Sequence, residues 1–147
     1  MDGTTPPYLV SAPLRRIAAA VYDVLPATSV VFAAAAVAVA VLRDAVAAGN
    51  PFFQAYLLTA VFLYFAGFWI RAGYTPGMRS WKTRIVTVDG RRPGWTAVLI
   101  RYLVGWVSVL CLGLGFLWAF WDRDRLMWHD RASGTRIVRD ETLYKKN

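Results

Sequence analysis

Long apolar segments alternate with shorter basic ones along this chain. Residues 14–42, 51–70 and 95–121 are apolar over almost their whole length, whereas residues 71–94 and 122–147 are polar and rich in arginine. A helix needs about 20 apolar residues to cross a bilayer core about 30 Å thick. The pattern therefore predicts two membrane-spanning helices, a basic loop, a third helical segment and a polar tail.

The third apolar segment has two interpretations. Its 27 residues, 95–121, would measure about 40 Å as one helix, which exceeds the hydrocarbon core but is too short for two full spans. A single tilted span places the C-terminus outside the cell. A broken pair of helices over 93–110 and 113–121, bent near residues 112–115, returns the chain to the side from which it came, and glycine permits such a bend.

The distribution of basic residues predicts the orientation in the membrane. The loop 71–94 holds six basic residues and one acid, the tail 122–147 holds seven basic residues, and the turn 43–50 holds one. Basic residues in short loops stay on the cytoplasmic side. We therefore expect a multi-pass protein of the cell membrane with both termini in the cytoplasm, which favours the broken or re-entrant third segment.

Two short β-branched runs lie in the polar segments, at residues 85–88 and 136–138. Asp89 and Gly90 follow the first run and indicate a turn. Both runs lie on the expected cytoplasmic side, so we expect them to pair as strands. The predicted fold over residues 1–147 is a single all-α membrane domain, with about three transmembrane or re-entrant helices and this small β pairing.

The composition excludes a soluble enzyme. Hydrophobic residues make up 57% of the chain although its net charge is +8, and a soluble domain of this size cannot bury so much apolar surface. No phosphate-binding loop, HExxH helix or nucleophile elbow is present, so we expect no enzymatic activity, catalytic residue or cofactor. The single cysteine, Cys111, excludes an intrachain disulfide, and with His129 alone it provides too few ligands for a metal site.

The basic charge predicts a lipid partner. An isoelectric point near 10.2 often accompanies nucleic-acid binding. In this chain the basic residues flank apolar segments, so we expect contact with anionic lipid headgroups and none with nucleic acid. Such contacts contribute about 1 kcal/mol for each basic residue near the surface.

Within residues 17–42, 51–70 and 95–121 only two residues are charged, Asp23 and Arg101. A carboxylate at the depth of Asp23 costs roughly 2.5–3.5 kcal/mol on insertion scales, so it needs a partner inside the protein. We expect Asp23 and Asp130 to lie near arginines, with Arg16 or Arg101 serving at least one of them. Asp23 then acts either as a structural clamp between helices or as an ion or proton site.

Several stretches resemble one family of membrane proteins. Residues 15–23 (Arg-Arg-Ile-Ala-Ala-Ala-Val-Tyr-Asp) resemble the first-helix signature of the RDD family of small bacterial membrane proteins. Residues 129–138 resemble the family's tail pattern H-D-x-x-x-G-T-x-V-V, and residues 75–78 resemble its T-x-G-K loop. The family is named for one arginine and two aspartates. Arg16 matches this arginine, and Asp23 and Asp130 match the two aspartates. Arg101 lies at a position of the third segment where family members commonly have an arginine.

One position departs from the family pattern. Met78 stands where the family often has lysine, and Arg79 follows it. We expect Arg79 to replace that lysine in any contact with lipid phosphate. The resemblance implies a bacterial membrane protein, and members of the family are regarded either as transporters, including sodium/proton exchangers, or as accessory components of membrane complexes.

Two functions follow as hypotheses. The first is an ion or small-solute transporter in which Asp23 binds and releases a cation or proton. About three helices cannot enclose a path alone, so this transporter would be a homo-oligomer. The second is a non-transporting scaffold or accessory subunit of a larger membrane complex, in which Arg16, Asp23 and Asp130 hold the tail against the helices.

Overall fold

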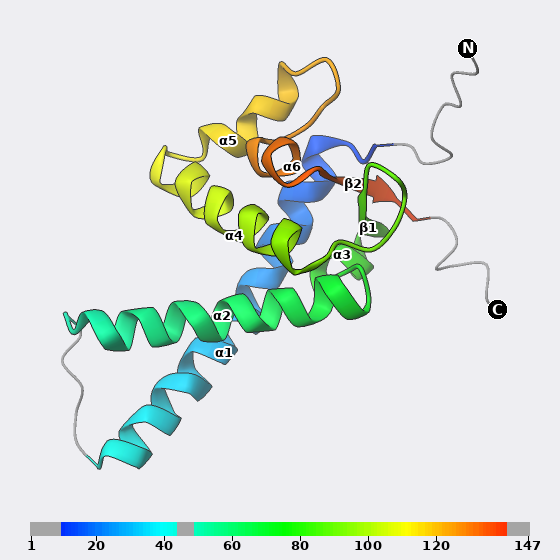
Figure 1. Cartoon of the computed structure of the whole chain (residues 1–147). Coiled ribbons are helices and arrows are strands. Elements are labelled where there is room, and N and C mark those ends of the chain that lie inside the picture. Colours follow the sequence, from blue (N-terminus) through cyan, green and yellow to red (C-terminus); the bar gives the residue numbers. More distant parts are fainter. Residues whose placement is uncertain (1–9, 44–48, 141–147) are drawn as a thin grey trace.

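The computed structural model describes residues 10–43 and 49–140 of the chain (Figure 1). Its two longest helices are α1 (Pro13–Leu42) and α2 (Pro51–Arg71). Both begin with proline, because the first turn of a helix needs no N–H from that position. The prediction of two long apolar helices, over residues 14–42 and 51–70, is therefore confirmed.

The connection between α1 and α2 is described only at its ends. Arg43 ends α1 in the left-handed conformation. The Asn50 side chain caps α2 by accepting a hydrogen bond from the Phe52 amide at 2.9 Å. Residues 44–48 of the predicted turn lie outside the described part of the chain.

The third apolar segment is broken, which is the interpretation that the basic tail favours and the glycines near residue 113 permit. It forms α4 (Trp95–Leu110), α5 (Leu114–Leu117) and a 3₁₀ turn, η1 (Trp118–Phe120), and the chain bends by 108° between α4 and the segment after it. Gly113 lies at the bend with a φ of 79°, a conformation that glycine adopts without strain. By length and composition α1 and α2 can each cross a membrane. The helices on the two sides of the bend are long enough for a third span only if they are counted as one segment.

The predicted strands pair. β1 (Thr83–Thr87) and β2 (Thr135–Arg139) form an antiparallel two-stranded sheet in which Ile85 lies opposite Ile137. A single bridge between Val10 and Val138 extends the sheet at its β2 edge. The pairing of residues 85–88 with residues 136–138 is therefore confirmed in its main part, since β1 ends at Thr87.

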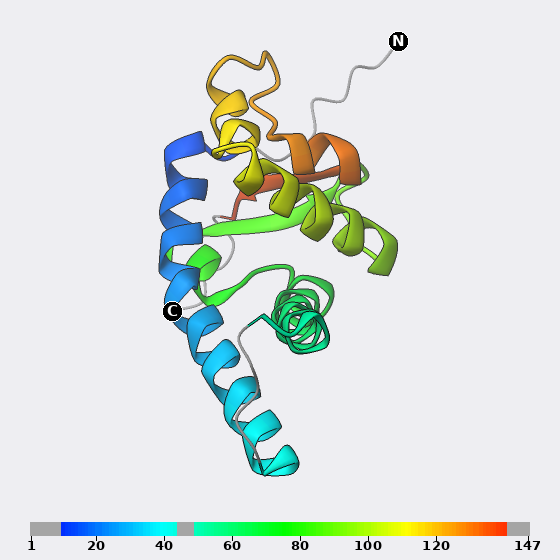
Figure 2. The ribbon, with the colours of Figure 1, turned by 90° about the vertical axis from the view of Figure 1, so that its left-hand side faces the viewer.

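Two short helices precede the strands. α3 (Pro76–Ser80) leads into β1, and α6 (Trp128–Ser133) leads into β2. Together α3, β1, α6 and β2 form a unit that we call the sheet module. Figures 1 and 2 show this module beside the first half of α1, while the second half of α1 extends away from it.

The core lies where the sheet module meets α1. Ala19, Met78, Ile85 and Ile137 are buried against one another, and three partly buried aromatic residues pack around them. Large apolar side chains elsewhere on α1, α2 and α4 remain exposed, as Phe32, Phe52 and Leu110 do. A soluble monomer rarely exposes so many apolar residues, so these helices belong in a membrane.

Candidate functional site

A buried carboxylate joins three parts of the chain. Asp130 on α6 is only 1% exposed. Its Oδ2 accepts a hydrogen bond from Arg16 Nη1 on α1 at 2.9 Å, and its Oδ1 accepts one from Arg101 Nη1 on α4 at 2.5 Å. Both are also ion pairs. The prediction that Asp130 lies near Arg16 or Arg101 is confirmed for both arginines.

Local structure holds each member of this cluster in place. Asp130 is the third residue of α6, and its Oδ2 also accepts from the Met127 amide at 3.1 Å, which caps the helix. Arg16 Nε donates to the Ser11 carbonyl at 3.0 Å, and Arg101 Nη1 donates to Thr135 Oγ1 at 2.9 Å. The cluster therefore connects α1 and α4 to the first residue of β2 as well as to α6.

The cluster carries one positive charge. Burial by itself would raise the pKa of Asp130, but the charges of Arg101 and Arg16 outweigh burial and hold this pKa below its ordinary value. Asp130 is therefore ionised, and arginine is always protonated in proteins. Two guanidinium groups then face a single carboxylate.

His129 lies beside the cluster without adding to its charge. Burial first, and then the positive charge of Arg101, lower the pKa of His129 from 6.5 to about 3. Its ring packs against Phe116 at a centroid distance of 5.2 Å, and its Nε2 lies 3.6 Å from Asp130 Oδ1. The imidazole is therefore neutral at physiological pH.

The prediction that Asp23 lies near an arginine partner is wrong. Asp23 accepts hydrogen bonds from the Thr75 hydroxyl and, at 2.8 Å, from the Gly77 amide. Both donors belong to the start of α3, where Thr75 also accepts a bond from the Met78 amide. Free N–H groups at a helix N-terminus satisfy a carboxylate without any cation, and Arg101 binds Asp130 instead.

Glycine at position 77 makes this contact possible. A Cβ atom on Gly77 would lie 2.2 Å from the Ala19 carbonyl oxygen and 2.8 Å from Asp23 Cγ. α3 and α1 can approach this closely only because Gly77 has no side chain. In the sequence, only the Thr-Pro-Gly stretch at residues 75–77 points to these donors, because it is typical of a helix N-terminus, where N–H groups are free.

Met78 and Arg79 have different surroundings. Met78 is buried in the core beside Ala19 and Ile85, so this position faces the protein interior. Arg79 lies at the surface, with its guanidinium 6.0 Å from the centroid of the Tyr74 ring. Of these two positions, only Arg79 is exposed enough to meet a lipid headgroup.

A comparison with models of protein families gives one match. The model of the RDD family matches residues 10–134, which is most of the chain. The chain belongs to the RDD family. No curated protein and no solved structure matches it. The match includes Arg16, Asp23, Arg101 and Asp130 and ends one residue before β2.

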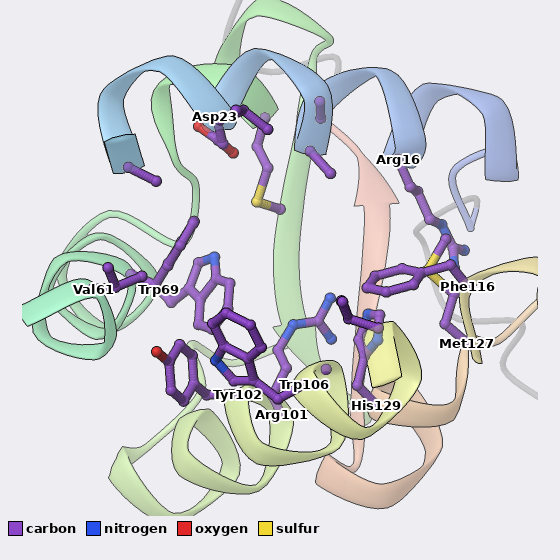
Figure 3. Close-up of a pocket in the computed structure, with 18 of the residues that line it drawn as sticks. Arg16, Asp23, Val61, Trp69, Arg101, Tyr102, Trp106, Phe116, Met127 and His129 are labelled. Carbon is purple, nitrogen blue, oxygen red and sulfur yellow. The ribbon is translucent and has the colours of Figure 1, made fainter. Parts of the chain in front are cut away.

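The RDD domain contains a cavity between its three apolar helices. The cavity has a volume of about 470 Å³ and is lined mainly by side chains of α1, α2 and α4, and also by Met127, His129 and Ile137. Its walls are almost entirely apolar. Figure 3 shows Arg101 between Trp69 on one side and His129 on the other, with the Arg101 guanidinium 5.5 Å from the centroid of the Trp69 ring. Arg16 and Asp23 also line the cavity.

Proposed function

We propose that this RDD domain is a membrane scaffold or accessory subunit without enzymatic activity. The observation that carries the proposal is that both aspartates of the family motif are bound by other groups of the same chain. Asp130 binds two arginines, and Asp23 binds a hydroxyl and a backbone amide. In this proposal the aspartates fix the shape of the domain.

The two aspartates attach the sheet module to the helices at separate points. Asp130 connects α6 to α1 and α4, and Asp23 connects α1 to α3. Breaking a buried ion pair by removing one partner costs about 3–5 kcal/mol, so the Asp130 connection is strong. A module held at a fixed position against the helices is suited to present a surface to a partner protein.

The proposed orientation places the sheet module in the cytoplasm with both termini. Exposed arginines of the loop, such as Arg79 and Arg91, would then contact anionic headgroups of the inner leaflet. The exposed apolar faces of α1, α2 and α4 would contact lipid, further copies of the chain or other subunits of a membrane complex.

Transport remains a second candidate because Asp23 lines the cavity. A transporting carboxylate must exchange its protein partners for a cation or proton. Asp23 would have to leave the Thr75 hydroxyl and the Gly77 amide, and several copies of the chain would have to enclose the path. These requirements make transport the less favoured function.

A flux assay separates the two functions. Wild type, Asp23→Asn and the surface control Asp89→Asn would be reconstituted in lipid vesicles, and uptake of Na⁺ and movement of H⁺ would be recorded. The scaffold predicts rates equal to those of empty vesicles for all three proteins. It also predicts that Asp23→Asn lowers the free energy of unfolding by about 1.5–3 kcal/mol, the contribution of a hydrogen bond to a charged group. Flux that Asp23→Asn abolishes and Asp89→Asn retains would contradict the scaffold.

A further inference from the structure

The cavity is elongated, with Arg16 near one end of its α1 wall and Asp23 part-way along that wall. Its α1 wall runs from Arg16 to Val31 with the three- and four-residue spacing of one helix face. At 1.5 Å per residue this wall is about 22 Å long. Away from Arg16 the lining is apolar, with Val31 at the end of the α1 wall and Val61 on α2 on the side opposite Arg16 (Figure 3). This arrangement suits a ligand with a polar head and an apolar chain.

Three buried polar atoms of cavity-lining residues have no hydrogen-bond partner in the described part of the chain. They are Arg16 Nη2, Trp69 Nε1 and His129 Nδ1. Most buried polar groups of native proteins are paired, so each exception requires an explanation. The arginine and tryptophan nitrogens can only donate. A polar head that pairs with Arg16 Nη2 must therefore carry acceptor atoms, whereas Trp69 lies on the side of Arg101 away from Arg16 (Figure 3).

The local charge favours an anion at this end of the cavity. Arg16 and Arg101 share one carboxylate, Asp130, and the neutral His129 does not balance the second arginine. Asp23 also lines the cavity, but it lies seven residues from Arg16 along α1, about 10 Å by the helical rise. Its carboxylate already accepts from Thr75 and Gly77. A negative headgroup is thus attracted to the end that holds Arg16 and Arg101.

We propose that this cavity binds a single-chain anionic lipid. The carboxylate head lies against Arg16 and Arg101, and the acyl chain extends along the α1 face toward Val31. A wall about 22 Å long exceeds half of a hydrocarbon core about 30 Å thick, so a chain from one leaflet fits beside it. This binding site is compatible with either the scaffold or the transporter, and its test is independent of both.

Electron paramagnetic resonance with a matched pair of probes tests the headgroup. The full chain is reconstituted in phosphatidylcholine vesicles and given spin-labelled palmitic acid, or its methyl ester, at a pH where the acid is ionised. The motionally restricted signal reports bound probe. We expect the acid to bind about tenfold more tightly than the ester, because the ester cannot form the charged hydrogen bonds. Equal binding of acid and ester would overturn the proposal.

A matched pair of glycine substitutions tests the location. Gly105 and Gly67 both lie inside helices, and a Cβ on either would meet nothing within 4 Å, but only Gly105 lines the cavity. Gly105→Leu fills the cavity and should remove the part of the restricted acid signal that exceeds the signal of the ester, whereas Gly67→Leu should leave that part unchanged. An undiminished signal in Gly105→Leu would overturn the proposal.

A second pair keeps the test decisive if Gly105→Leu does not fold. Ala27 lines the α1 wall of the cavity, and Ala36 on the same helix is exposed and does not line it. Ala27→Phe should remove the part of the restricted acid signal that exceeds the signal of the ester and Ala36→Phe should retain it, with folding of both checked by thermal unfolding. The same signal in both variants would mean that the lipid binds elsewhere, and the proposal would be wrong.

Discussion

At the scale of single residues, Asp130 has the largest structural role. Two arginines from different helices converge on its carboxylate. Either arginine alone would balance its charge, so loss of one leaves a neutral pair. Loss of Asp130 leaves two buried guanidinium groups without a counterion. Asp130→Asn should therefore destabilise the protein more than Arg16→Leu or Arg101→Leu does.

His129 gives the stability of the protein a defined dependence on pH. Its pKa is about 3 in the folded state and 6.5 in the unfolded chain. The unfolded state therefore binds more protons below pH 6.5, and folding loses stability as the pH falls from 6.5 toward 3. The expected slope is at most about 1.4 kcal/mol per pH unit, measured by thermal unfolding in detergent between pH 7 and pH 4.

The control for this prediction is His129→Gln, which keeps a polar side chain but does not titrate. Its stability should change much less between pH 6.5 and pH 4. Asp130 titrates in a separate window, because its lowered pKa means that its contribution is lost only below the ordinary range of an aspartate. An unchanged slope in His129→Gln would show that the dependence has another source.

At the scale of elements, the contact between α1 and α3 depends on Gly77. Gly77→Ala places a methyl group 2.2 Å from the Ala19 carbonyl, so the two helices must separate. We expect a loss of about 1–3 kcal/mol, typical of overpacking, measured as a lower unfolding temperature. Gly67→Ala is the control, because its methyl group meets nothing and alanine favours a helix interior. Equal stability of the two variants would refute the requirement for glycine.

Most of the elements follow from simple patterns in the sequence. The length of the apolar segments predicts α1 and α2, because the bilayer fixes the length of a spanning helix. The glycines near residue 113 permit the bend after α4, and β-branched runs predict β1 and β2. Each of these signals is local, so it does not depend on how distant segments meet.

The partner of Asp23 shows where such prediction stops. The cost of a buried carboxylate requires a partner, and charge alone suggests an arginine. The actual donors, the Thr75 hydroxyl and the Gly77 amide, carry no net charge, and they reach Asp23 only because α3 packs on α1. The Thr-Pro-Gly sequence at residues 75–77 indicates that a helix begins there, but it does not indicate that this helix packs against α1 beside Asp23.

At the scale of the whole molecule, the sheet module gathers at one end and leaves long apolar stretches of α1 and α2 exposed (Figures 1 and 2). This asymmetry agrees with the proposed orientation, in which the basic loop and the module lie in the cytoplasm. A fluorescent protein fused after Asn147 should fluoresce, and alkaline phosphatase fused there should be inactive. Phosphatase inserted between Gly49 and Asn50 should be active. An active phosphatase after Asn147 would contradict this topology.

The central claim is that the Arg16–Asp130–Arg101 cluster holds the sheet module against the helices, whereas Asp23 acts separately. A pair of double-mutant cycles, measured by equilibrium unfolding in detergent, tests it most directly. One cycle combines Asp130→Asn with Arg101→Leu. The other combines Asp23→Asn with the same Arg101→Leu.

The account predicts strong coupling in the first cycle and little in the second. Arg101→Leu should cost at least about 1 kcal/mol less when Asp130 is already asparagine, because it then removes an unpaired buried charge. With Asp23→Asn, the two losses should add to within about 0.5 kcal/mol, since these residues share no hydrogen-bond partner. Additivity in the Asp130 cycle together with coupling in the Asp23 cycle would contradict the account.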